Sequence, residues 1–153
     1  MLKDSQALVR ELPLPDGAAT ERLGALIAGG LAVGDAVALE GDLGAGKTTL
    51  ARAILRALGV SEEVPSPTFT LVQHYDTKRL AVRHYDLYRV KDAIELRELG
   101  LDEALDEGAA LIEWPQRLGA ALPDSALHVA LSITGPTSRE ARLSGPSKWA
   151  SHV

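Results

Sequence analysis

One segment of the sequence, GDLGAGKT at residues 41–48, matches the pattern G-x-x-x-x-G-K-[ST] in full. Average composition would produce such a match by chance in fewer than roughly one chain in a hundred. In this pattern a glycine-rich loop points backbone N–H groups at a polyphosphate, and the glycines allow the positive φ angles and close approach that this requires. Because the loop has to join a buried strand to the start of a helix, the segment predicts a nucleoside-triphosphate site in an α/β fold.

The residues on either side of the loop have the patterns that it needs. Residues 35–40 are almost wholly apolar between their ends, which is typical of a strand covered on both faces of a parallel sheet. Residues 47–58 carry apolar side chains at helical spacing, and Gly59 follows them. The chain therefore has the required order of strand, loop and helix.

Helices and strands alternate along the rest of the chain. Helical periodicity marks residues 18–28 and residues 93–106, the second of which is interrupted at Gly100. Strand patterns mark the remaining segments, which are residues 7–12, 69–75, 80–85, 109–113, 127–133 and 140–143.

These elements predict a P-loop NTPase fold. We expect a three-layer α/β/α sandwich around a mostly parallel sheet with antiparallel hairpin edges. The 153 residues suffice for one domain with a buried core, and we expect that domain to span residues 1–143. The polar residues 144–153 are expected to form a flexible C-terminal tail.

Composition excludes several classes of function. The chain has no cysteine, so disulfides, thiolate catalysis and cysteine-ligated metal sites are impossible. Its 16 basic and 21 acidic residues give a net charge of −5, which disfavours direct binding of nucleic acid. Neither a run of 18 apolar residues nor a signal-peptide pattern is present, so we expect a cytoplasmic protein that does not enter a membrane.

The side chains of the loop have distinct expected roles. Lys47 is expected to neutralise β- and γ-phosphate charge, the Thr48 hydroxyl to ligate Mg²⁺, and Thr49 to approach the α-phosphate. We therefore expect the loop to bind the nucleotide through Asp42, Leu43, Gly44, Ala45, Gly46, Lys47, Thr48 and Thr49.

Two acidic residues end predicted strands and are candidates for the chemistry. Glu113 follows a fully apolar strand that should lie beside the strand before the loop, which favours a role in the metal shell. Asp86 ends a less apolar strand and suits positioning of the attacking water or a switch. Each could instead be a solvated carboxylate that caps a helix or pairs with an arginine.

The proline-flanked segment at residues 66–70 stands where a nucleotide-sensing loop is expected. The hydroxyl groups of Ser66, Thr68 and Thr70 could meet the γ-phosphate or Mg²⁺, and a rigid loop could transmit the presence of that phosphate. Simple turn chemistry is the alternative.

Other side chains could contact either the core or a partner. Trp114 could lie beside the phosphate site, face a partner protein, or pack in the core. A basic cluster around the predicted hairpin could be a docking surface or a solvated face. It consists of Lys78, Arg79, Arg83, Arg89 and Lys91.

Four motifs together resemble the TsaE family, formerly YjeE, of small bacterial ATPases. They are residues 41–49, SPTFTLV at 66–72, HYDLYR at 84–89 and EWP at 113–115. Their order and spacing extend the resemblance over about residues 13–142. The resemblance implies ATP and Mg²⁺ as cofactors and a role in forming N6-threonylcarbamoyladenosine at position 37 of tRNAs that read codons beginning with A. It also implies TsaB and TsaD as partners.

The resemblance assigns roles to individual residues. It implies that Thr48 and Glu113 hold Mg²⁺ and that Asp86 is needed for hydrolysis. It also implies that the segment from Pro15 to Thr20 borders the adenine. Lys47, Asp86 and Glu113 are then the catalytic residues. It also implies that tRNA is served only indirectly, with ATP favouring docking onto a TsaB–TsaD assembly and hydrolysis resetting it.

Three other readings compete with an ATPase subunit. A small-molecule kinase of the P-loop type would need a cationic lid, for which Arg139 and Arg142 are the late candidates, although both fall on a predicted hairpin. A GTPase lacks support, because the sequence at Thr77-Lys78-Arg79-Leu80 does not supply the base-reading acid. A nucleotide-binding interaction module that barely hydrolyses ATP is the third.

Overall fold

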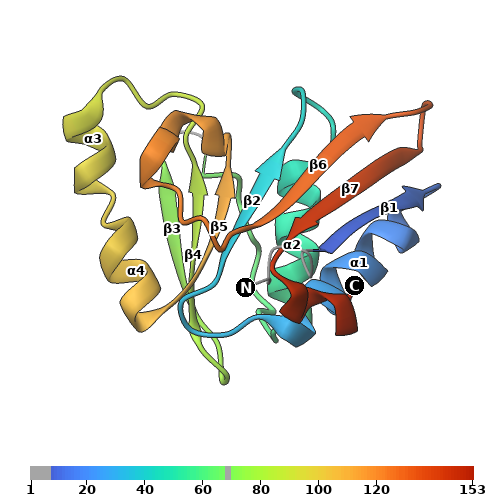
Figure 1. Ribbon diagram of the computed structural model, residues 1–153, viewed down its shortest axis with the longest axis horizontal. Coiled ribbons are helices and arrows are strands. Elements are labelled where there is room, and N and C mark those ends of the chain that lie inside the picture. The colour runs from blue at the N-terminus through green and yellow to red at the C-terminus, as the bar shows by residue number, and fades with distance from the viewer. Residues whose placement is uncertain (1–7, 68–69) are drawn as a thin grey trace, which may run out of the picture.

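A computed structural model describes residues 8–67 and 70–153, and within them a seven-stranded sheet has the order β1-β7-β6-β2-β5-β4-β3 (Figure 1). Its central strands, β6, β2, β5 and β4, run parallel. Antiparallel pairs lie at both edges, where β3 joins β4 and where β7 joins β6 and β1. The strands are β1 Leu8–Leu14, β2 Ala36–Glu40, β3 Val72–Asp76, β4 Ala81–Asp86, β5 Gly108–Glu113, β6 Leu127–Ile133 and β7 Arg139–Gly145.

Helices cover both faces of the sheet. Along β5 the side chains alternate, so that Leu111 belongs to the core shared with α1 and α2, whereas Ala110 and Ile112 belong to the core beneath α3 and α4 (Figure 1). This arrangement confirms the predicted α/β/α sandwich. Within residues 8–67 and 70–153, none of the helices has the length and apolar character needed to cross a bilayer. The helices are α1 Gly17–Gly30, α2 Lys47–Ala57, α3 Ala93–Glu98, α4 Leu101–Glu107, and the 3₁₀ helices η2 Pro115–Ala121 and η3 Ser147–Ser151.

Two predicted elements differ from the structure by more than one or two residues at their ends. The helical pattern at residues 93–106 forms two helices, because Gly100 between them adopts the left-handed conformation with φ 65°. The strand predicted from residue 69 begins at Val72. Residues 68 and 69 lie outside the described part of the chain, and Thr68, predicted to meet the nucleotide, is one of them.

The prediction of a flexible tail at residues 144–153 was wrong. Strand β7 extends to Gly145, and η3 follows it. The Trp149 side chain is only 1% exposed, and both Trp149 and Val153 belong to the core on the α1 side of the sheet. A Cβ added at Gly30, the last residue of α1, would lie 2.8 Å from the Trp149 ring. The segment is polar on average, but the buried side chains of Trp149 and Val153 pack it against the core.

Replacing Trp149 by Ala is expected to lower the free energy of unfolding by about 3–5 kcal/mol, because a large buried side chain is lost and a cavity remains. Chemical denaturation followed by circular dichroism measures this change. Ser151→Ala, at an exposed position of the same 3₁₀ helix, is the matched control. A loss below about 1 kcal/mol for Trp149→Ala would show that the C-terminal segment does not stabilise the fold.

Candidate nucleotide-binding site

The loop between β2 and α2 has the backbone that phosphate binding requires. Gly41, Gly44 and Gly46 all have positive φ angles, of 143°, 84° and 109°. At Gly41 an added Cβ would lie 2.5 Å from the carbonyl oxygen of Leu131, so a larger residue would force this loop apart. No side chain caps the start of α2 at Gly46, which leaves the first N–H groups of that helix available for an anion.

Lys47 lies folded against its own loop. Its Nζ donates hydrogen bonds to the carbonyl oxygens of Gly41, at 2.6 Å, and Asp42, at 3.0 Å. The same ammonium lies 4.3 Å from the centroid of a Trp114 ring. Burial lowers the pKa of Lys47, and the nearby carboxylate of Glu113 is the strongest influence against that shift. Lys47 is therefore a desolvated cation beside the loop that is predicted to bind phosphate.

Sheet register brings Glu113 to the loop. Strand β5 lies parallel to β2, with Glu113 opposite Leu39, and its side chain is nearly fully buried. The Thr48 hydroxyl lies 2.9 and 2.8 Å from the two carboxylate oxygens of Glu113. The structure thus places the two predicted metal ligands in direct contact.

These donors fit Mg²⁺. Proteins hold this ion with one or two carboxylates together with substrate phosphates and water, and not with a complete cage of side chains. Residues 8–67 and 70–153 contain no group of three or more His, Asp or Glu side chains that could hold a metal by themselves.

Asp86 stands beside Glu113 at the same edge of the sheet. The two residues are register partners at the ends of β4 and β5, and Asp86 is only 5% exposed. Its Oδ1 accepts a hydrogen bond of 3.1 Å from the backbone N–H of Tyr88, which fixes the orientation of the carboxylate.

One cavity joins the predicted phosphate, metal and hydrolysis residues. We call it the phosphate cavity, and its volume is about 230 Å³. Both acids reach it, as do the start of α2 and the segment after α2. The lining residues are Leu43, Gly44, Gly46, Lys47, Thr48, Thr49, Ser66, Asp86, Glu113 and Trp114.

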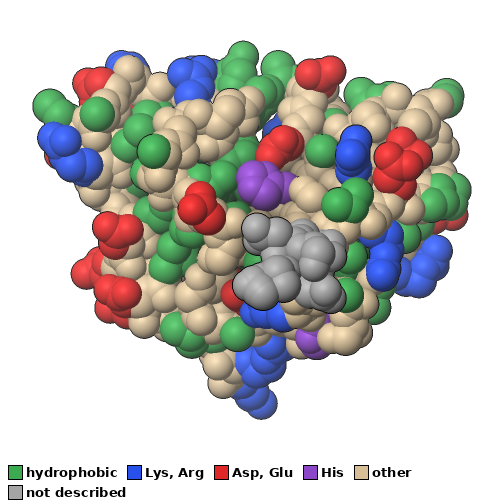
Figure 2. Space-filling view, viewed as in Figure 1, with side chains coloured by type: hydrophobic (Ala, Val, Ile, Leu, Met, Phe, Trp, Pro, Cys, Tyr) green, Lys and Arg blue, Asp and Glu red, His purple; other side chains and the backbone are tan. Residues whose placement is uncertain are grey.

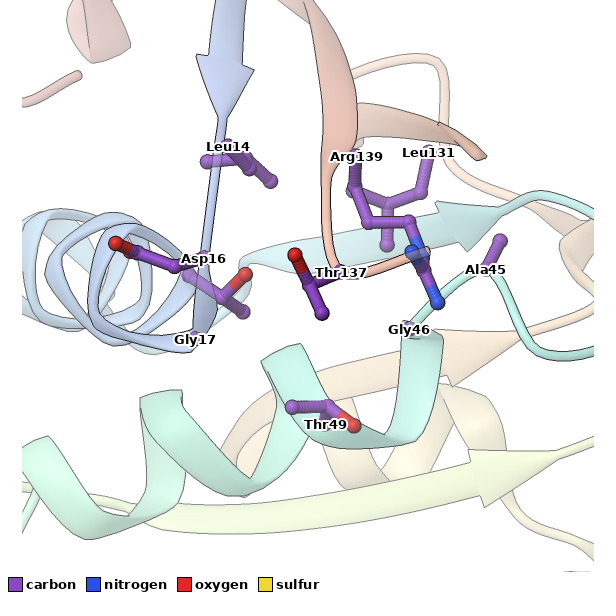
Figure 3. A pocket seen from close by; sticks show the side chains of 10 residues that line it. Leu14, Asp16, Gly17, Ala45, Gly46, Thr49, Leu131, Thr137 and Arg139 are labelled. Atoms are coloured by element: carbon purple, nitrogen blue, oxygen red, sulfur yellow. The ribbon is translucent and has the colours of Figure 1, made fainter. Parts of the chain in front are cut away.

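A second cavity, of about 140 Å³, adjoins the first through Gly46 and Thr49 and is here called the base cavity. It lies between the start of α1, the loop and the turn before β7 (Figure 3). Thr20, predicted to border the adenine, lines it. Its lining consists of Leu14, Asp16, Gly17, Thr20, Ala45, Gly46, Thr49, Leu131, Thr137 and Arg139.

Comparison with known proteins decides the family. The family model described as "Threonylcarbamoyl adenosine biosynthesis protein TsaE" matches residues 14–141. The chain belongs to the TsaE family. A protein from Rickettsia felis named "tRNA threonylcarbamoyladenosine biosynthesis protein TsaE" is 40% identical over 121 residues, which cover 78% of this chain and 71% of that protein.

Further relatives agree with this assignment. The Bacillus subtilis protein of the same name is 41% identical over 108 residues, covering 70% of this chain and 67% of its own length. The crystal structure of YdiB from Bacillus subtilis matches with a TM-score of 0.77 at 30% identity, over 92% of this chain and 87% of that chain. The matched range of the TsaE family contains every predicted site residue of this chain, and the fold is that of a P-loop NTPase.

Sequence reasoning missed part of the base cavity in this TsaE-family protein. Arg139 was considered only for a kinase lid, but it begins β7 and its Nη2 donates a 3.1 Å hydrogen bond to the carbonyl oxygen of Gly44 in the loop. In Figure 3 its guanidinium group extends from β7 toward Gly46. The contact spans 95 positions of sequence, so no local pattern indicates it.

Replacing Arg139 by Ala is expected to weaken nucleotide binding by about 10–100-fold, since a charged hydrogen bond contributes about 1.5–3 kcal/mol. Calorimetric titration with ADP measures the effect. The control is Arg142→Ala, which removes the same charge from an exposed position of β7. Equal affinities of the two variants would contradict a role for Arg139 in the cavity.

The remaining candidates have mixed outcomes in the structure. Trp114 lines the phosphate cavity and packs against Tyr88, with ring centroids 4.8 Å apart.

Two arginines of the basic cluster make contacts that stabilise the fold. Arg79 donates to the carbonyl oxygens of Ala28 and Leu31 at the end of α1, and Arg83 forms ion pairs with acidic side chains of α4. The cluster is therefore not one free docking surface.

Proposed function

We propose that this protein is an Mg²⁺-dependent ATPase that acts with TsaB and TsaD in forming the threonylcarbamoyl group on adenosine 37 of tRNAs that read codons beginning with A. The observation that carries the proposal is the convergence of Lys47, Thr48, Asp86 and Glu113 on one cavity at the carboxyl ends of the parallel strands. Family membership supplies the pathway.

Binding of ATP would exchange contacts within the loop for contacts with phosphate. Lys47 leaves the carbonyl oxygens of Gly41 and Asp42 and neutralises the β- and γ-phosphates, while the uncapped N–H groups of α2 hold the same anion. Thr48 and Glu113 would hold Mg²⁺, which when bound offsets phosphate charge. The adenosine part of the nucleotide occupies the base cavity, beside Thr20 and Arg139.

Asp86 would orient the attacking water. Its carboxylate lines the phosphate cavity, and the hydrogen bond from Tyr88 fixes one oxygen. A carboxylate held in this way can accept a hydrogen bond from water and direct its lone pair at the γ-phosphate.

Charge supports an indirect role in tRNA chemistry. Acidic side chains gather over α4, at the left edge of Figure 2, where they would repel a phosphate backbone. They belong to Asp102, Glu103, Asp106 and Glu107. Partner proteins then handle tRNA. This subunit couples the binding and hydrolysis of ATP to the state of a cytoplasmic complex.

The experiment measures ATP turnover by the purified protein alone and with TsaB and TsaD. We expect weak ATP turnover by the protein alone and a clear rise when TsaB and TsaD are added. In a complementation assay, cells that lack this chain should lose the threonylcarbamoyl modification of their tRNA. Fast turnover that partners do not change would contradict the proposal. A phosphorylated small molecule among the products would identify a kinase instead.

A further inference from the structure

His84 is a fully buried histidine beside the phosphate cavity. The glycine-rich loop motif gives no reason for a histidine at this position. This histidine lies on β4, where Val82 and His84 point to the same face of the sheet as α2. Its Nε2 lies 2.7 Å from Oε2 of Glu113. A buried imidazole loses its hydration, so a side chain in this position needs a compensating partner, and Glu113 provides it.

Hydrogen bonds link His84 through Glu113 to Thr48 at the start of α2. The Thr48 hydroxyl has one proton, which it shares between the two oxygens of Glu113, and the carboxylate only accepts. The Nε2–H of His84 therefore donates to Oε2. Nδ1 has no hydrogen-bond partner within the described residues, so the bond to Glu113 is the polar contact that orients this ring there.

The orientation of Glu113 depends on such a partner. The last torsion of a glutamate side chain is broad and nearly two-fold, so the backbone of β5 does not fix the plane of its carboxylate. Thr48 alone would leave that plane free to turn, because either oxygen can accept its hydrogen bond. A second donor at Oε2, the Nε2–H of His84, removes this freedom.

We propose that His84 is a positioning residue that holds the Glu113 carboxylate toward Thr48 and thereby sets the affinity of the nucleotide site for Mg²⁺. The proposal rests on the Mg²⁺–nucleotide site described above. Partners of metal ligands typically contribute about 10–100-fold to metal affinity, and His84 is expected to act in that range.

The test compares two replacements of His84. In His84→Gln the amide NH₂ can reach the position of Nε2 and still donate, whereas His84→Leu removes the donor at similar volume. ADP binding is measured by calorimetry over a series of Mg²⁺ concentrations and in EDTA. His74→Leu, at an exposed position of the neighbouring strand β3, is the control.

We expect His84→Leu to raise the Mg²⁺ concentration for half-maximal enhancement of ADP binding by about 10–100-fold. Its affinity for ADP in EDTA should stay within about threefold of the wild type, and His84→Gln should recover most of the Mg²⁺ effect. Three results overturn the proposal. They are an unchanged Mg²⁺ requirement in His84→Leu, an equally large loss of ADP affinity in EDTA, and a His84→Gln variant that does not recover the Mg²⁺ enhancement of ADP binding.

Two further results keep the test decisive. If His84→Leu does not fold, His84→Asn replaces it, because its amide is too short to reach Glu113; equal Mg²⁺ requirements of the Asn and Gln variants would refute the role of His84. A wild-type protein that binds no nucleotide with Mg²⁺ would refute the proposed function itself, whereas an unchanged Mg²⁺ requirement in His84→Leu refutes only the positioning role.

Discussion

Replacing Lys47 by Ala is expected to weaken ATP binding by about 100-fold or more. In the structure this ammonium is held at the phosphate cavity by the carbonyl oxygens of Gly41 and Asp42. In the ATP complex it would instead make charge-assisted hydrogen bonds to two phosphate groups, each contributing about 1.5–3 kcal/mol. No other lysine or arginine lines this cavity within the described residues. Calorimetric titration with ATP and Mg²⁺ measures the loss.

A control has to separate the loss of one positive charge from the loss of a lysine at the phosphate cavity. Lys78→Ala removes the same charge from an exposed position in the turn between β3 and β4 and should bind ATP like the wild type. Circular dichroism of Lys47→Ala should show the native helix content, since the lysine contributes little to either core. Binding within about threefold of the wild type would mean that the loop does not hold the phosphates through Lys47.

The sequence predicted the centre of this molecule well because its signals there are local. The apolar strand, the glycine loop and the helix after it are adjacent in the chain, and the positive φ angles of Gly41, Gly44 and Gly46 match what the motif requires. The position of Glu113 beside the loop could be predicted because a wholly apolar strand belongs in the middle of a parallel sheet, next to the strand that precedes the loop.

The parts that could not be predicted depend on contacts between distant segments. The hydrogen bond from Arg139 joins β7 to Gly44 in the loop, and the contact of His84 with Glu113 joins β4 to β5. Neither contact leaves a periodic pattern in the sequence. The prediction of a flexible tail was wrong for a related reason. Its average polarity predicts exposure, whereas the position of Trp149 is decided by the space beside Gly30 at the end of α1.

Replacing Asp86 by Asn is expected to leave ATP binding within about threefold of the wild type and to lower turnover by about 10²–10⁴-fold, the usual contribution of a positioned acid or base. The amide oxygen of Asn can still accept the hydrogen bond from Tyr88, so the local backbone is preserved. What is lost is the negative charge that would draw a proton of the attacking water. Single-turnover hydrolysis in the presence of TsaB and TsaD measures the chemical step.

This result would also distinguish the roles of the two acids. Glu113 contacts Thr48, so Glu113→Gln should change the Mg²⁺ requirement, whereas Asp86→Asn should not. Asp76→Asn, at an exposed position of β3, controls for the loss of one negative charge. Because Asp86 and Glu113 are register partners on β4 and β5, an Asp86→Asn variant that turns over normally would place the water-positioning role on Glu113. One that fails to bind ATP would show that Asp86 belongs to the metal shell.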